Sequence, residues 1–213
     1  GGLAQAGRAR GGIASEAGIT EARREKFRAE VADHYFRVTT EAVRKADPNH
    51  LILGARLHDW SKYTQGIVEA CARYCDVVSV NYYSRWQPEP LYMANLATWC
   101  GERPFIISEF YVKADDASYK GRPYPNTDGG GWLVRTQRSR GEFYQNFCLR
   151  LLETRRCAGW MHFEYTDGYS GGRGSNKGIV SVEYQPYADY LSMMKTLHAN
   201  LCRLASYYDA DGR

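Results

Sequence analysis

The sequence lacks the features that mark several common classes of protein. It has no run approaching the roughly 20 apolar residues that a membrane-spanning helix needs. Its net charge is only +4, and its 28 Lys and Arg residues are interleaved with 24 Asp and Glu residues. The concentrated basic stripe that is typical of nucleic-acid-binding proteins is therefore missing. We expect no membrane and no nucleic-acid partner, and a neutral or weakly charged ligand fits this charge balance better.

Motifs for binding a metal or a nucleotide are also missing. The closest pair among the six cysteines is Cys71 and Cys75, and no paired His follows it, so the spacing matches no zinc site. The glycine-rich segment Gly171–Gly178 lacks the Gly-Lys-Ser/Thr ending of a phosphate-binding loop. We therefore predict reduced, mostly buried thiols, no metal and no cofactor.

What the chain does have is enough apolar sequence for a core. Of its 213 residues, 44% are hydrophobic and 14% are aromatic, which suits one domain or part of a larger one. Residues 1–19 are rich in Gly, Ala and Arg without apolar periodicity, and we expect a flexible leader or a cut end there. The folded domain is expected over residues 20–205, followed by a frayed tail over 206–213.

Apolar spacing predicts one long helix followed by alternating strands and helices. The helix is expected from Thr20 to Ala46, with an apolar face made of Phe27, Val31, Tyr35, Val38 and Ala42. Short apolar runs predict strands at Leu51–Leu57, Asp76–Val80, Pro104–Glu109 and Cys157–Phe163, and a small extra strand at Gly178–Glu183. Further helices are expected at Thr64–Tyr74, at Leu91–Cys100, from Ser139 to near Arg155, and after Pro186.

This order of elements limits the possible folds. Helical crossovers between successive strands imply an α/β fold with a parallel sheet. Four βα units make up half of a TIM (β/α)8 barrel, and its open edges and apolar inner face should drive self-association. The simplest assembly is a homodimer that closes a barrel around a two-fold axis, and the alternative fold is a small open α/β layer.

The segment Pro104–Tyr111 carries the strongest candidate for catalysis. It reads Pro-Phe-Ile-Ile-Ser-Glu-Phe-Tyr, so the predicted strand ends on Glu109 and aromatic residues follow. Groups that do chemistry lie at the carboxyl ends of parallel strands, and Glu109 is therefore our candidate catalytic residue. Tyr111 is a candidate for binding substrate. The alternative is that Glu109 is a solvated residue at a strand end.

The ends of the other predicted strands supply further candidates. Arg56 could orient Glu109 or a sugar hydroxyl, or it could simply form an ion pair. His58 and His162 could act as acids or sugar ligands, although a lone His is more often structural. Trp160 has the best position among the Trp residues for stacking on a sugar, because it belongs to a strand whose end faces the predicted site.

Four segments together resemble the second half of a clan A glycoside hydrolase, closest to the agarase-like branch. They are Asp47–Gly54, Asp76–Tyr83, Pro104–Phe110 and His162–Asp167, in the order that the family has them. The resemblance extends from roughly Tyr35 to Leu201. It implies a (β/α)8 barrel, of which this chain has the equivalents of the last strands, and hydrolysis with retention of configuration.

The resemblance also implies roles for individual residues. Glu109 takes the place of the nucleophile, and Tyr83, two residues after Asn81, would hydrogen-bond it. Asn81 and Tyr83 thus belong to the substrate site, while Trp160 or His162 would form the floor on which the sugar lies. The chain departs from the family in two ways. No Asn-Glu pair, the family's acid/base motif, occurs in it, and His162 stands where agarases usually have Trp.

Retaining hydrolysis needs a second carboxyl group about 5–5.5 Å from the first. Glu164 is the best candidate within the chain, because adjacent parallel strands lie about 4.8 Å apart, but Asp167, Asp59 or a partner chain could also supply it. We predict a retaining glycosidase acting on β-linked galactosides or related oligosaccharides, with Glu109 and Glu164 as catalytic residues. The alternative is an inactive half-barrel that binds carbohydrate or assembles with a partner chain.

Overall fold

The computed structural model describes residues 19–170 and 173–210 of the chain. Its first element is helix α2 (Glu21–Ala46), which Thr20 caps, since the Thr20 hydroxyl accepts a hydrogen bond from the backbone amide of Arg23. The predicted long helix is thus confirmed. The expected flexible leader lies outside the described residues except for its last position.

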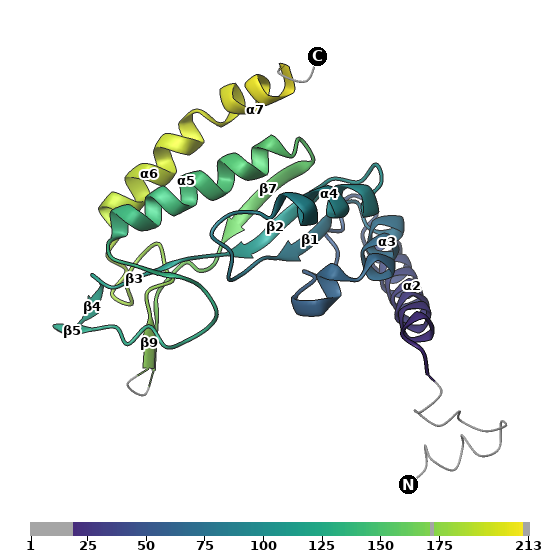
Figure 1. The fold of residues 1–213 in the computed structure, drawn as a ribbon, viewed down its shortest axis with the longest axis horizontal. Coiled ribbons are helices and arrows are strands. Elements are labelled where there is room, and N and C mark those ends of the chain that lie inside the picture. Colours follow the sequence, from purple (N-terminus) through teal and green to yellow (C-terminus); the bar gives the residue numbers. More distant parts are fainter. Residues whose placement is uncertain (1–18, 171–172, 211–213) are drawn as a thin grey trace, which may run out of the picture.

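A three-stranded parallel sheet forms the centre of the molecule (Figure 1). Its strands are β1 (Val78–Asn81), β2 (Phe105–Phe110) and β7 (Cys157–His162), with β2 in the middle. The chain passes between them through α4 (Pro90–Trp99) and α5 (Gln137–Glu153). The predicted α/β class with parallel strands is confirmed, and three of the predicted strands are present.

The remaining predicted strand, Leu51–Leu57, does not form. Only Leu57 makes a bridge, which is parallel to Val80. The backbone at Gly54 and Arg56 has positive φ values of 73° and 49°, whereas an extended strand requires negative φ. The prediction of a regular strand is therefore wrong, although the end of the segment still lies beside β1.

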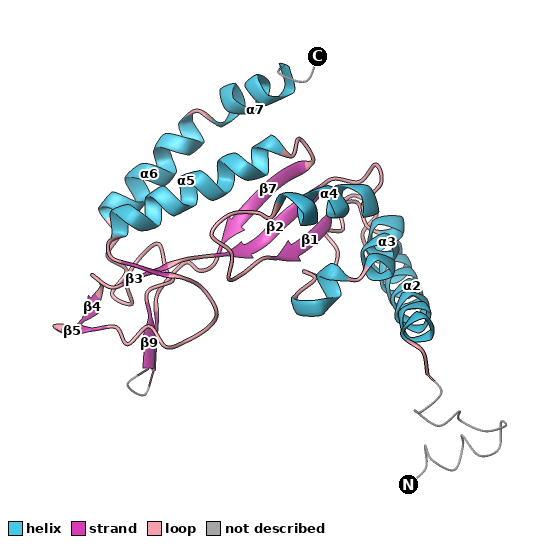
Figure 2. Cartoon of the chain, viewed as in Figure 1, coloured by secondary structure: helices cyan, strands magenta, loops and turns pink. Residues whose placement is uncertain are grey.

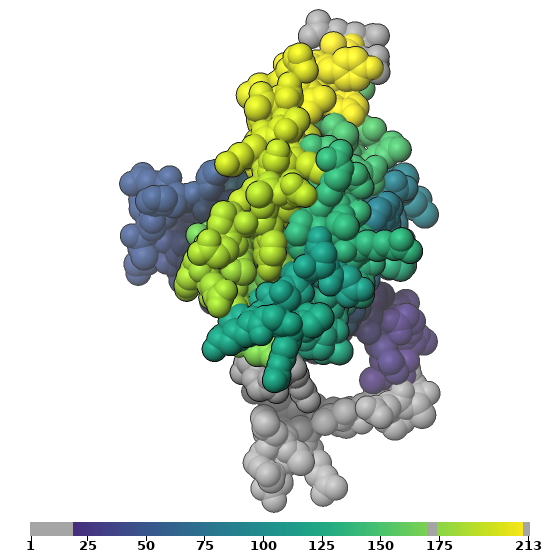
Figure 3. Space-filling model, turned by 90° about the vertical axis from the view of Figure 1, so that its left-hand side faces the viewer, coloured from purple at the N-terminus to yellow at the C-terminus, as the bar shows by residue number. Residues whose placement is uncertain are grey.

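Helices flank the sheet (Figure 2). Besides α4 and α5 these are the 3-10 helix η2 (Asp59–Tyr63), α3 (Gln65–Tyr74), α6 (Ala188–Ala199) and α7 (Leu201–Ala210). Figure 3 shows α6 and α7, in yellow, lying along α5. Helix α7 includes residues 206–210, where the sequence predicts a frayed tail. No helix in the described part of the chain is long and apolar enough to cross a membrane.

The connections after β2 and β7 contain short β-pairs. β3 (Lys113–Ala114) pairs with β6 (Leu133–Val134), β4 (Ser118–Tyr119) with β5 (Arg122–Pro123), and β8 (Gly168–Ser170) with β9 (Arg173–Ser175). The extra strand expected at Gly178–Glu183 is reduced to bridges made by Val180. Helix α5 begins two residues before the predicted Ser139, because Thr136 is its cap and accepts the Ser139 amide at 3.1 Å.

Aromatic packing between the sheet and its helices builds the core. Phe110 of β2 stacks on Phe147 of α5 with ring centroids 4.5 Å apart, and both side chains are almost completely buried. Tyr82, just beyond β1, stacks on Tyr92 of α4 at 5.4 Å. Successive strand residues point to opposite faces, and Met161 of β7, on the face away from these helices, is 47% exposed. All six cysteines are free and four are buried, as predicted.

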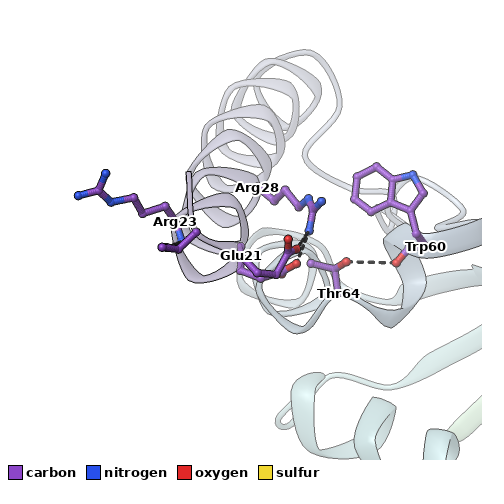
Figure 4. A network of polar contacts seen from close by, with 7 residues as sticks. Glu21, Arg23, Arg28, Trp60 and Thr64 are labelled. Atoms are coloured by element: carbon purple, nitrogen blue, oxygen red, sulfur yellow. Dashed lines mark hydrogen bonds and ion pairs between the residues drawn. The ribbon is translucent and has the colours of Figure 1, made fainter. Parts of the chain in front are cut away.

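A polar cluster joins the start of α2 to η2 (Figure 4). Arg28 forms an ion pair with Glu21, and its guanidinium carbon lies 5.3 Å from the centroid of the Trp60 ring. Thr64 donates a hydrogen bond to the Trp60 carbonyl at 3.1 Å. The cation–π contact thus links α2 to η2, the element that follows Arg56 on the chain.

Candidate active site

Glu109 lies near the carboxyl end of β2, the central strand of the sheet. In Figure 1 the strands point toward the loops around β3 and β9. The register between β1 and β2 shifts after Val80, so that Asn81 is paired with Glu109. A bulge of this kind re-aims side chains, and the Glu109 side chain is left 13% exposed at the strand end. The residue that the sequence places at a strand end is therefore found there.

Arg56 contacts Glu109 directly. Its guanidinium forms an ion pair with Glu109 Oε1 and lies 3.5 Å from the carbonyl oxygen of Ser108. Its backbone amide donates a hydrogen bond to the Ser79 hydroxyl at 2.9 Å, which ties this positive-φ residue to β1. Arg56 therefore holds one carboxylate oxygen of Glu109, in agreement with the ion pair that the sequence analysis allowed.

Asn81 supports the strand ends rather than the cavity beside them. Its side-chain oxygen accepts a hydrogen bond from the Ser108 hydroxyl at 2.8 Å. Ser108 is 2% exposed and directly precedes Glu109. Asn81 thus links the ends of β1 and β2 at the position of the bulge, which fixes the backbone that carries Glu109.

An aromatic cavity lies beside these strand ends. Its volume is about 400 Å³. It is lined by His58, Tyr83, Ser84, Tyr111, Gly129, Gly130, Phe163 and Lys177. The Tyr83 ring is central to the wall, because its centroid lies 5.4 Å from that of His58, 5.2 Å from that of Tyr111 and 6.2 Å from that of Phe163. Aromatic walls of this kind suit the apolar face of a sugar ring.

Two of the predicted tyrosines therefore belong to one wall. Tyr83 makes ring contacts, and within the described residues it forms no hydrogen bond with Glu109. Tyr111 is 5% exposed. Burial raises the pKa of Tyr111 to about 12, and the negative charges of Glu164, Asp128 and Glu109 add to this effect. Its hydroxyl consequently stays protonated at neutral pH.

Glu164 follows β7, the strand next to β2. Its backbone amide donates a hydrogen bond to the Lys177 carbonyl at 3.2 Å. Burial raises the pKa of its carboxyl group, Lys177 opposes this shift, and the negative charges of Asp167 and Glu109 add to it. Glu164 is thus close enough to Glu109 for their charges to interact, and its environment favours the protonated form.

The other two carboxylates considered from the sequence have different roles. Asp167 is 4% exposed, and its oxygens accept hydrogen bonds from the Asn176 side chain, the Gly178 amide and the Tyr187 hydroxyl. It therefore organises the loop after β7 and is enclosed by its own partners. Asp59 is exposed at the start of η2. Neither lines the aromatic cavity.

Trp160 and His162 do not line the cavity, because both point to the helix-covered face of β7. The Trp160 indole donates a hydrogen bond to the Tyr144 hydroxyl on α5 at 2.8 Å. His162 Nε2 lies 2.7 Å from the Lys177 carbonyl and must donate to it, so Nδ1 accepts from the Tyr190 hydroxyl at 3.0 Å. The structure thus corrects the expectation that these residues form a sugar-binding floor.

The environment of His162 also removes it as a proton donor. Burial and the positive charge of Arg140 lower the pKa of His162 to about 3. The ring is therefore neutral at physiological pH, and both of its nitrogen atoms are engaged within the fold. His58, in contrast, lines the aromatic cavity, and its role as a sugar ligand stays a prediction.

Sequence reasoning missed several residues of the cavity. Phe163 follows the end of β7 and belongs to the segment His162–Asp167, which resembles the family. Its position next to Glu164 is the one sequence signal that indicates a place in the site. Lys177, Gly129 and Gly130 come from loops, where neither strand periodicity nor a motif indicates a site. Among the described residues, no group of three His, Cys, Asp or Glu side chains is arranged to hold a metal ion.

The parallel α/β fold is similar to that of solved structures of other proteins. A β-galacturonidase from Eisenbergiella tayi has a TM-score of 0.53 over 80% of this chain and 31% of its own, and at 17% identity this likeness shows the fold alone. No family model matches the chain.

More similar proteins include beta-agarases. Beta-agarase B of Vibrio sp. strain JT0107 is 28% identical over 175 residues, which are 80% of this chain and 17% of that protein. The crystal structure of BpGH50 is 37% identical with a TM-score of 0.83, covering 91% of this chain and 40% of its own. An exo-beta-agarase is 31% identical with a TM-score of 0.76, covering 88% of this chain and 25% of its own. The predicted likeness to agarase-like glycoside hydrolases is confirmed, and the chain spans less than half the length of each of these relatives.

Proposed function

We propose that this chain carries the nucleophile of a glycoside hydrolase that acts on β-linked galactose polymers. The observation that carries the proposal is Glu109, a little-exposed carboxylate near the carboxyl end of the central strand, paired with Arg56 and close to an aromatic cavity. The similarity to beta-agarases supports the substrate class.

In the proposed retaining mechanism, Glu109 attacks the anomeric carbon and Glu164 donates a proton to the leaving oxygen. Arg56 directs one oxygen of Glu109 and offsets its charge. The raised pKa of Glu164 supports its role as the acid, because a proton donor must hold its proton until the bond breaks. Water then hydrolyses the glycosyl-enzyme, with Glu164 acting as the base. His58, Tyr83 and Tyr111 would contact the sugar.

The test is turnover of aryl β-galactosides and agarose oligosaccharides by the wild type and by Glu109→Gln. We expect the substitution to abolish turnover while the circular dichroism spectrum stays the same. Glu102→Gln is the matched control, because Glu102 is an exposed residue before β2 and should be neutral. Equal rates for Glu109→Gln and the wild type would exclude Glu109 as the nucleophile. Retention is checked separately by proton NMR of the first anomer formed.

A second candidate is a carbohydrate-binding half-barrel without turnover, completed by a second copy of the chain. Exposed apolar side chains favour such an assembly: Leu51 is 69% exposed, Leu53 42% and Met161 47%. In this proposal the three-stranded sheet of each chain, together with the segment that ends at Leu57 beside β1, closes a TIM (β/α)8 barrel as a homodimer. Light scattering at micromolar concentration tests it, and we expect Met161→Asp to give monomers. A wild type that is already monomeric would contradict it.

A further inference from the structure

Lys177 presents a positive charge to the aromatic cavity. Its Nζ lies 5.3 Å from the centroid of the Tyr111 ring and 5.9 Å from that of the Phe163 ring. Both rings line the cavity together with Lys177 itself. Within residues 19–170 and 173–210, no carboxylate oxygen lies within 4.0 Å of this ammonium group. The charge is therefore placed by aromatic rings and is left without a close counter-ion.

The backbone of Lys177 is held in place by three donors. Its carbonyl oxygen accepts from Arg140 Nη2 at 2.9 Å, from His162 Nε2 at 2.7 Å and from the Glu164 amide at 3.2 Å. Arg140 is completely buried, so this anchor belongs to the core. A backbone fixed in this way reduces the freedom that the Lys177 side chain would lose on binding a ligand.

A second lysine holds the loop that contributes Gly129 to the cavity. Lys113 is 5% exposed, and its Nζ donates to the carbonyl oxygens of Asn126 at 2.7 Å, Asp128 at 3.3 Å and Gly129 at 3.4 Å. Burial lowers the pKa of Lys113, and the positive charge of Lys177 lowers it further. The two ammonium groups therefore lie close enough to repel each other, and an anion between the loops would relieve this repulsion.

The negative groups nearby offset this positive charge only in part. Glu164 interacts with Lys177 electrostatically, but its carboxyl group is shifted toward the neutral form by burial. The negative charge of Asp128 raises the pKa of Lys113 and so opposes the effects of burial and of Lys177. The cavity thus combines an ammonium group, which lies over the rings of Tyr111 and Phe163, with the further aromatic ring of Tyr83.

We propose that Lys177 forms a subsite for an anionic substituent, either a sulfate ester or a carboxylate, on a sugar unit of the substrate. The aromatic rings that line the cavity contact the sugar, and the ammonium group, which lies over the rings of Tyr111 and Phe163, pairs with the anion. The preferred substrates are then charged galactans rather than neutral ones. This inference rests on the proposed function, because it assigns the substrate class of the same site.

The test is calorimetric titration of the whole chain with three galactose oligosaccharides of equal length. One is neutral, one carries a sulfate ester and one carries a uronic acid unit. We expect the wild type to bind at least one charged oligosaccharide about tenfold more tightly than the neutral one at low salt, as for one charge-assisted contact. The preference should shrink at 1 M salt. The arm that shows the preference identifies the anion.

Lys177→Met should bring the ratio of charged to neutral affinity close to one, and Lys177→Arg should keep most of it. The matched control is Lys195→Met, because Lys195 is an exposed residue of α6 that does not line the cavity. Circular dichroism checks that each variant is folded. A wild type that binds neutral and charged oligosaccharides equally, or a Lys177→Met variant that keeps the full ratio, would overturn the inference.

This outcome is separable from that of the proposed function. Turnover of neutral galactosides without any anion preference overturns the subsite and leaves Glu109 as the nucleophile. An anion preference that depends on Lys177, in a chain that turns over no galactoside, supports the subsite and overturns the catalytic proposal. A chain that binds none of the three oligosaccharides overturns both.

Discussion

Replacing Arg140 by Met should destabilise the protein strongly, although Arg140 touches no substrate in the proposed site. Arg140 is completely buried on α5 and forms hydrogen bonds with all three of its guanidinium nitrogen atoms. The acceptors are the carbonyls of Val112, Lys177 and Gly178 and the side chains of Gln137 and Asn176, at 2.9 to 3.2 Å. The Tyr190 ring lies 4.3 Å from the guanidinium carbon.

The magnitude follows from which acceptors keep another donor. In the Met variant the Lys177 carbonyl still accepts hydrogen bonds from His162 and from the Glu164 amide. The Asn176 side-chain oxygen still accepts one from the Gln137 side chain. The carbonyls of Val112 and Gly178 and the Gln137 oxygen lose their donor. Each buried acceptor left without a partner costs about 1–3 kcal/mol, so the loss of three donors should lower the free energy of unfolding by about 3–9 kcal/mol. Domains of this size have about 5–15 kcal/mol in total.

Urea unfolding followed by tryptophan fluorescence measures this change. Arg140→Lys is the intermediate variant, since it keeps the charge but has one side-chain nitrogen atom in place of three. Its free energy of unfolding should lie between that of Arg140→Met and that of the wild type. Arg138→Met is the control two residues earlier on α5. The Arg138–Glu142 pair is 3.5 Å long and both side chains are mostly exposed, so its loss should cost about 0–1 kcal/mol. Equal midpoints for Arg140→Met and Arg138→Met would refute the reasoning.

Three further predictions concern the end of β7, the loop that follows it and the site. His162 is neutral in the folded protein because its pKa there is about 3, whereas the pKa of an unfolded His is near 6.5. Between pH 3 and pH 6.5, unfolding is therefore accompanied by the uptake of one proton. Stability should fall as pH falls through this window by up to about 1.4 kcal/mol per pH unit, and His162→Gln should flatten this part of the urea midpoint profile. Gly178→Ala should lower the free energy of unfolding more than Gly101→Ala does, because a Cβ at Gly178 would overlap surrounding backbone atoms. At Gly101 a Cβ meets open space, so only the positive φ opposes the substitution, which should cost about 1 kcal/mol. Arg56→Met should lower kcat/KM about tenfold by releasing Glu109, and an unchanged value would show that the ion pair does not orient the carboxylate.

Local sequence patterns were sufficient to predict most elements of the fold but not all of their contacts. The helix Glu21–Ala46 and the strands around β1, β2 and β7 were predicted because capping residues and apolar runs are local signals. The buried face of α2 is predicted wrongly from the sequence. Apolar spacing indicates the face of Phe27 and Val31, but these side chains are 66% and 51% exposed, whereas Phe36 is 4% exposed. Which face is buried depends on α3, and this tertiary contact leaves no pattern within the helix itself.

The candidate site shows the same division between local and tertiary information. Glu109 could be placed from its strand, and Glu164 from its position after the next strand. Trp160 and His162 were misplaced because the side on which a strand residue points depends on register, and each step of one residue reverses it. Hydrogen bonds to α5 and α6 show that these two residues face the helices.

Lys177 explains why loops were the hardest part of the site to predict. Nothing in its sequence surroundings distinguishes it from the other lysines, since its position depends on Arg140, which lies 37 residues earlier and donates to its carbonyl oxygen. Arg140 itself looks like an ordinary helix residue until its complete burial is known. Because one buried guanidinium fixes both the backbone of Lys177 and that of Gly178, the charge in the cavity is a property of the core. A conservative change at Arg140 should therefore weaken the proposed anion preference, even though Arg140 contacts no ligand.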